Sequence, residues 1–119
     1  MPKHNFRKLN IWIQSMDLSE EIYNLTKYFP PEEKFGLIAQ MRRSAVSIAS
    51  NISEGCGRGT NAQFAHFLDI SIGSAYELET QIILSHRLNM WHTDNYDIIL
   101  SSIHQIQNGI ISFQNTLIK

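Results

Sequence analysis

The stretch that decides the fold is residues 50–64, "SNISEGCGRGTNAQF", which holds three of the six glycines of the chain. A dinucleotide-binding loop requires a strand before its glycines, and a P-loop requires a Gly-Lys-Ser/Thr ending. Here a helical pattern precedes the glycines, and that ending is absent. The stretch therefore predicts a corner between two helices, in which Gly55 ends the first helix and Thr60, with Gln63 three residues later, caps the second.

Two chemical alternatives remain at this corner. The helix N-terminus at Thr60 and Asn61, with Arg58 beside it, is of the kind that binds anions. Cys56 is a nucleophile only if a histidine base lies against it, and no local motif supplies one. The helix corner is the interpretation that needs no further partner.

Amphipathic periodicity extends outward from the corner in both directions. Apolar or small residues recur at alternating spacings of about three and four, which predicts helices over residues 8–29, 31–54, 61–88 and 94–117. The stripes are Ile11, Ser15, Leu18, Ile22, Leu25 and Phe29; Ile38, Met41, Ala45, Ile48 and Ile52; Phe64, Leu68, Ser71, Ala75, Leu78 and Ile82; and Tyr96, Ile99, Ile103, Ile106, Ile110, Phe113 and Leu117.

The connections between these helices are short. Pro30 and Pro31 end the first helix and open the second, Asn89 ends the third, and Thr93 or Asp94 caps the fourth. Small residues in the middle of the second and third helices allow their axes to approach closely. The sequence therefore predicts one all-α domain over residues 1–119, an antiparallel up-down-up-down four-helix bundle.

Two predicted helices carry apolar residues outside their core stripes. Ala39, Val46 and Ala49 give the second helix another apolar side, and off-stripe isoleucines such as Ile98 and Ile111 do the same for the fourth. A helix with two apolar faces usually has two partners. We therefore expect the bundle to associate with further copies of itself.

Composition narrows the class of protein. The chain is 43% hydrophobic and 18% charged, with a net charge of −1, which does not suit binding of nucleic acid by charge alone. The charge is uneven, because residues 1–60 carry +2 and residues 61–119 carry −3. A single cysteine excludes a disulfide framework, and no run predicts a signal peptide or membrane span. We expect a cytoplasmic protein with no membrane partner.

No residue pattern announces catalysis. No histidine follows a glutamate by three residues, so the Glu-x-x-His pairs of bundle di-metal sites are absent. No two histidines lie three or four residues apart, as a helical metal pair requires. We expect no enzyme, no metal or other cofactor and no small-molecule substrate, and we assign no catalytic residue.

Basic side chains are the candidate contacts to a nucleic acid or a protein partner. They are Lys34, Arg42, Arg43 and Arg58. The alternative is that these side chains are solvated or pair with carboxylates, for which Glu54, Glu77 and Glu79 are available.

Three ordered motifs carry a family resemblance. They are "FP-x-E-E-x-x-G-L" over residues 29–37, "Q-M-R-R-S-A-V-S-I-x-x-N-I-S-E-G" over residues 40–55, and "F-x-x-F-L-x-I-x-x-G-S-x-x-E-L-E-T-Q" over residues 64–81. Over residues 6–88 the chain resembles the four helix bundle protein family, first named for open reading frames within intervening sequences of bacterial 23S rRNA genes.

The resemblance implies a small, non-enzymatic, all-helical bundle that assembles as a ring-like homopentamer. It extends to the accessory variability protein of diversity-generating retroelements, which binds nucleic acid and a reverse transcriptase through a basic surface. The matching positions are Arg42, Arg43, Asn51, Glu54, Gly55, Gly57 and Arg58.

Together these observations predict a homo-oligomeric scaffold or interaction protein associated with RNA or a nucleic-acid-processing partner. The alternative is a module that binds RNA or DNA directly through the second helix and the Gly57-Arg58 corner.

Overall fold

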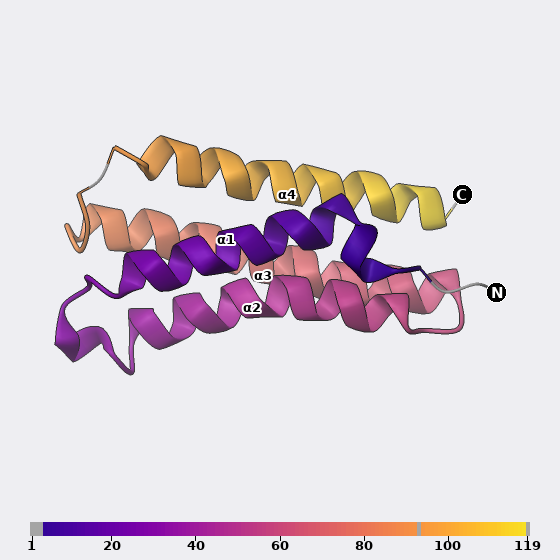
Figure 1. Cartoon of the computed structure of the whole chain (residues 1–119), viewed down its shortest axis with the longest axis horizontal. Coiled ribbons are helices and arrows are strands. Elements are labelled where there is room, and N and C mark those ends of the chain that lie inside the picture. The colour runs from indigo at the N-terminus through magenta and orange to yellow at the C-terminus, as the bar shows by residue number, and fades with distance from the viewer. Residues whose placement is uncertain (1–3, 93, 119) are drawn as a thin grey trace.

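The computed structural model describes residues 4–92 and 94–118, which contain helices and no strand. The α-helices are α1 (Asn10–Thr26), α2 (Leu37–Cys56), α3 (Asn61–Arg87) and α4 (Tyr96–Leu117), and 3₁₀ turns span Phe6–Lys8 and Pro31–Glu33. The four helices pack side by side, with the α1–α2 and α3–α4 connections at one end and the α2–α3 corner at the other (Figure 1). The all-α prediction is confirmed for these residues.

Within the described part of the chain, no helix has both the length and the apolar character needed to cross a membrane.

Helix α1 is shorter at both ends than the predicted 8–29. A 3₁₀ turn precedes it, started by Asn5, whose side-chain oxygen accepts a hydrogen bond from the Arg7 N–H at 3.2 Å. The helix ends at Thr26, and the chain then turns toward α2. Phe29 is still buried, so the predicted core position is kept by the turn rather than by helix.

Helix α2 begins six residues later than predicted, because the Pro-Glu-Glu segment forms only a 3₁₀ turn. Gly36 follows that turn with φ −103° and ψ −117°, a non-helical conformation, and acts as the N-cap. The Glu33 carboxylate accepts a hydrogen bond from the Leu37 N–H at 3.2 Å, which satisfies one of the unpaired donors at the new helix start. Glu33 therefore caps α2 from outside it.

The corner between α2 and α3 confirms one predicted cap and corrects the other. The Thr60 hydroxyl accepts from the Gln63 N–H at 3.1 Å, as predicted, and the Gln63 side chain accepts from the Gly59 N–H at 3.2 Å. Gly55, however, does not end α2. The helix continues to Cys56, and Gly57 is the C-cap, with its N–H bonded to the carbonyl of Glu54 at 3.1 Å.

Helix α3 ends at Arg87 with Leu88 as the C-cap, and the predicted terminator Asn89 follows with φ 59°. The Asn89 N–H donates to the His86 carbonyl and the Met90 N–H donates to the Ser85 carbonyl, both at 3.0 Å. This pair of hydrogen bonds is characteristic of a Schellman motif. Ser85 also receives a hydrogen bond from the indole of buried Trp91, at 3.0 Å.

Helix α4 begins at Tyr96, with Asn95 as the N-cap, so the predicted cap at Asp94 is wrong by one residue. Thr93, the other predicted cap, lies outside the described residues. The Tyr96 ring stacks on His86 of α3, with 3.8 Å between ring centroids, and this contact joins the start of α4 to the end of α3.

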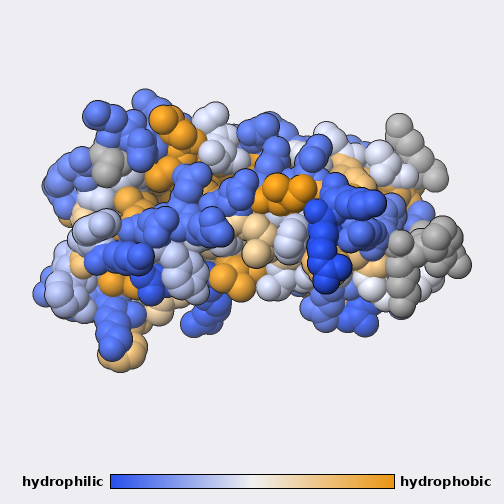
Figure 2. All heavy atoms as spheres, viewed as in Figure 1, coloured by the Kyte–Doolittle hydropathy of each residue, from blue (hydrophilic) through white to orange (hydrophobic). Residues whose placement is uncertain are grey.

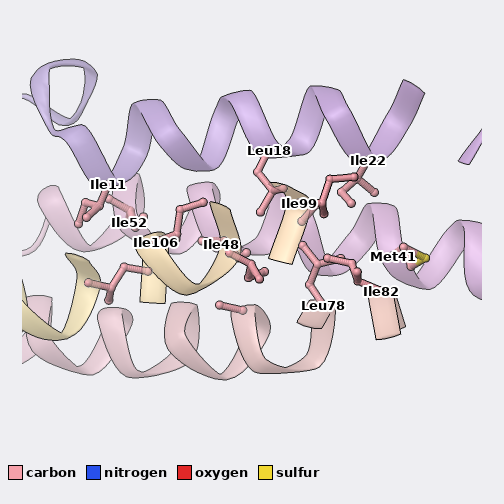
Figure 3. Packing of buried hydrophobic residues seen from close by; sticks show 14 of the residues in the cluster. Ile11, Leu18, Ile22, Met41, Ile48, Ile52, Leu78, Ile82, Ile99 and Ile106 are labelled. Carbon is pink, nitrogen blue, oxygen red and sulfur yellow. The ribbon is translucent and has the colours of Figure 1, made fainter. Parts of the chain in front are cut away.

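All four predicted stripes converge on one core (Figure 3). Fully buried side chains come from every helix, among them Ile22, Ile48, Ile82 and Ile103. Two polar stripe positions bond to backbone carbonyls: Ser15 donates to Ile11 at 2.6 Å and Ser71 to Ile48 at 2.8 Å.

Helices α2 and α3 form the most extensive helix pair. The hydroxyls of Ser47 and Ser74 lie 2.9 Å apart, and Ser71 of α3 reaches the backbone of α2 at Ile48. Small side chains therefore allow the close approach that the sequence predicted.

Candidate interaction surface

Arg42 braces α2 against the end of α1. Its Nε donates to the Thr26 hydroxyl at 2.9 Å and its Nη2 to the Tyr23 carbonyl at 3.4 Å, while the guanidinium lies 4.6 Å from the centroid of the Tyr23 ring. This is the C-terminal turn of α1, where the helix dipole favours a positive charge. The Arg42 side chain is thus used within the bundle.

Arg43 and Lys34, unlike Arg42, are exposed to solvent. Arg43 is exposed, and within residues 4–92 and 94–118 it makes no hydrogen bond or ion pair. Lys34 is exposed in the turn before α2, with its ammonium 5.5 Å from the ring centroid of Phe35, which is itself 87% exposed. These two cations are available to a partner.

Arg58 is engaged at the glycine corner. Its Nη2 forms an ion pair with Glu54 at 2.8 Å, and its guanidinium lies 4.5 Å from the centroid of the Phe67 ring. Arg42 and Arg58 lie toward opposite ends of α2, on the order of 20 Å apart at about 1.5 Å per residue. The structure does not bring the predicted basic residues into one patch.

Two of the family-motif residues, Asn51 and Gly55, have structural roles. The Asn51 amide donates to the Ser47 carbonyl at 2.8 Å and to its hydroxyl at 3.0 Å, next to the contact with α3. Gly55 is buried, and a Cβ there would lie 2.7 Å from the Phe64 ring and 3.0 Å from Cβ of Phe67. Gly55 therefore lets α3 turn back closely against α2.

Cys56 is not placed for chemistry. Its side chain is buried in the core, and burial raises the pKa of its thiol to about 11, so the reactive thiolate is scarce at neutral pH. Among the described residues, no group of three or more His, Cys, Asp or Glu side chains is arranged to hold a metal ion.

A polar cluster between α3 and α4 was not predicted from the sequence. Glu79 accepts hydrogen bonds from Gln107 and His104, each at 2.8 Å. These hydrogen bonds lower the pKa of the Glu79 carboxyl below its ordinary value. No local sequence pattern joins these residues, because the bonds depend on how α4 lies along α3.

A groove, here called the α1/α2 groove, runs between α1 and α2. Three adjoining hollows share side chains along it. Its main lining residues are Trp12, Met16, Ser19, Tyr23, Arg43 and Val46. Met16 is 41% and Val46 42% exposed, and hydrophobic atoms surface along the border of α1 and α2 (Figure 2).

The groove agrees with one sequence signal. Val46, Ala39 and Ala49 were the predicted second apolar side of α2, and all three line it. Trp12 and Met16 of α1 flank the groove on its other side. Exposed apolar surface of this kind is typical of a protein or peptide interface.

Comparison with known proteins identifies a matching family and a solved structure with a similar fold. Residues 7–112 match the family model described as 23S rRNA-intervening sequence protein. No curated protein sequence matches the chain. A crystal structure from Bacteroides thetaiotaomicron, of a protein of unknown function from the S23 ribosomal protein family, is similar to this chain at 27% identity and a TM-score of 0.80, covering 87% of this chain and 97% of its own. The chain therefore belongs to the family of 23S rRNA-intervening sequence proteins.

Proposed function

We propose that the protein is a non-enzymatic, homo-oligomeric helical bundle that acts in the cytoplasm as a scaffold or interaction protein. The observation that carries the proposal is the α1/α2 groove, where large apolar side chains stay about 40% exposed although the core beneath them is closed. Exposed apolar surface of this kind marks association sites more often than free surface. An up-down-up-down bundle assembled as a ring of five is the form that we propose.

Light scattering after size exclusion tests the proposal directly. The expected result is a stable multiple of the 13.7 kDa chain at micromolar concentration, with five copies as the specific expectation. A monomer at that concentration would contradict the proposal. A stable oligomer of another size would support the scaffold proposal and contradict only the ring of five.

Direct binding of RNA or DNA is the second candidate, and the exposure of Arg43 and Lys34 favours it. Arg42 and Arg58 are used within the chain, so each protomer offers few free cations, and a ring would have to multiply them by avidity. The relationship proposed to the retroelement accessory protein belongs to this candidate.

Fluorescence anisotropy with a structured RNA tests this candidate. Binding that weakens steeply between about 50 and 200 mM salt is expected if phosphates are the ligand. Replacing Arg43 and Lys34 with Gln should then reduce affinity. An intact oligomer that binds no RNA at low salt would remove this candidate and leave the scaffold proposal standing.

A further inference from the structure

The outer face of α3 carries a second stripe that points away from the core. Its members recur at spacings of three, four and seven, and are here called the α3 stripe: Ile70, Gly73, Glu77 and Leu84. Ile70 is 41% and Leu84 45% exposed. The outer face of a bundle helix is ordinarily polar, so the exposed Ile70 and Leu84, like the groove, are apolar surface that the protomer leaves uncovered, while Glu77 is bonded to Ser44 of α2.

Gly73 is the unusual member of the stripe. It lies in the interior of a 27-residue helix, where glycine is the least favourable residue except proline. A Cβ added there meets nothing within 4 Å, so packing within the protomer does not require the glycine. Without a Cβ, this point of α3 allows the backbone of a second molecule to approach closely.

Hydrogen bonds inside the protomer give the height of the stripe along the bundle. The Ser44 hydroxyl donates to Glu77 at 2.6 Å, so Glu77 is level with the start of α2 around Arg43. Ser47 meets Ser74 at 2.9 Å, which places Gly73 level with Ile48, about 3 Å along the helix axis from Val46. Two copies related by rotation about an axis parallel to the bundle keep these levels.

We propose that the α3 stripe of one copy seats in the α1/α2 groove of the next, in a head-to-tail contact. The inference rests on the proposed self-association and names the two faces that make it. Gly73 then lies near Val46, which two of the hollows share, and Glu77 faces Arg43 at the rim. Such a contact uses two different faces, so repetition closes into a ring when the rotation allows it.

The two faces are complementary in charge as well as in apolar character. Arg43 is a cation at the groove rim that forms no ion pair in the described residues. Glu77 is exposed, and the Ser44 hydroxyl that bonds it is neutral. Opposite charges at a rim fix the register of a contact, and like charges there oppose it.

Thiol coupling identifies the faces in contact. One preparation carries Val46→Cys, another carries Gly73→Cys with a size tag, and the two are produced together and treated with a short bismaleimide. The expected product joins one chain of each kind, and neither variant alone is coupled. The unchanged chain, with its buried Cys56, is the blank.

Three outcomes separate the two proposals. Coupling of Gly73→Cys to itself, or of Val46→Cys to itself, would mean a two-fold contact of like faces and would overturn the head-to-tail inference. A stable oligomer with no mixed product would overturn it too. If the unchanged chain is a monomer in light scattering, the proposed function is contradicted, and the head-to-tail inference that rests on it falls with it.

Charge reversal gives an independent test. Arg43→Glu and Glu77→Arg should each weaken self-association about tenfold, because each places like charges at every rim. Mixing the two variants should restore most of the association, since up to four of the five contacts in a mixed ring of five then pair opposite charges. Gln105→Glu, at an exposed position of α4, is the control that should change nothing. No recovery on mixing would contradict the inferred pairing.

Discussion

The two sides of α2 are closed in different ways. Toward α3, small residues meet: Ser47 touches Ser74, and Gly55 takes the Phe64 ring directly against its backbone. Toward α1, the large side chains Trp12 and Tyr23 stand at the border, and a groove remains between the helices. Side-chain size, on helices of similar apolar character, therefore decides whether a seam is sealed by the protomer or left for a partner.

The largest effect should come from breaking the sealed seam at Gly55. Gly55→Val adds a branched side chain where even a Cβ lies 2.7 Å from Phe64, so we expect a loss of about 3 kcal/mol in the free energy of unfolding. Urea denaturation measures it. Gly57→Ala is the matched control, because its Cβ only reaches ordinary contact, 3.4 Å from the Glu54 carbonyl. Equal losses for both variants would contradict this account of the seam.

The open seam is held by one polar brace, which gives a smaller effect. Arg42→Ala removes the bonds to Thr26 and Tyr23, and we expect a loss of about 1 kcal/mol of unfolding free energy. The adjacent Arg43→Ala is the control and should stay within about 0.5 kcal/mol, as surface substitutions do. If both changes cost the same, Arg42 is not a brace.

Packing within the protomer requires a glycine at Gly55 but not at Gly73, and a substitution at Gly73 tests this difference. Measured on dissociated protomers, Gly73→Ala should raise the free energy of unfolding by about 0.8 kcal/mol, because alanine favours helix and its Cβ meets open space. Thermal denaturation at high dilution reports the change. A destabilised protomer would show that Gly73 has a packing role in the single chain.

The smallest effect concerns pH and the seam between α3 and α4. Because hydrogen bonds hold the pKa of Glu79 below its ordinary 4.5, its ionised form stabilises the folded state above about pH 4.5, and this contribution is lost as pH falls through the folded-state pKa. Glu79→Gln should reduce the difference in unfolding free energy between pH 7 and pH 3.5 by about 0.5 kcal/mol. Urea titrations at pH 7 and pH 3.5 measure it, and an unchanged slope would contradict the role of the cluster.

Periodicity predicted the helices because the core stripes of a bundle are a property of local spacing. Helix ends were harder. Pro31 followed by two glutamates resembles a helix start, but Gly36 adopts a non-helical conformation and moves the start to Leu37. Gly55 and Gly57 are equally good terminators on paper, and only the distance to Phe64 shows that the first belongs inside the helix.

The candidate site was harder to predict than the fold. A sequence shows that Arg42 and Arg43 are adjacent, yet one reaches the end of α1 and the other faces solvent. That division depends on where α1 ends relative to α2. The apolar side of α2 around Val46 was visible from spacing, while the groove itself required the large side chains of α1.

The placement of the two tryptophans gives the molecule built-in fluorescent reporters. Trp91 is 4% exposed and hydrogen-bonded to Ser85, so its emission should be blue-shifted and should not change when a partner binds the surface. Trp12 lines the α1/α2 groove, where any occupant replaces water around the indole. In a Trp91→Phe variant the remaining emission comes from the groove alone, and its colour at increasing protein concentration reads out whether the groove is filled.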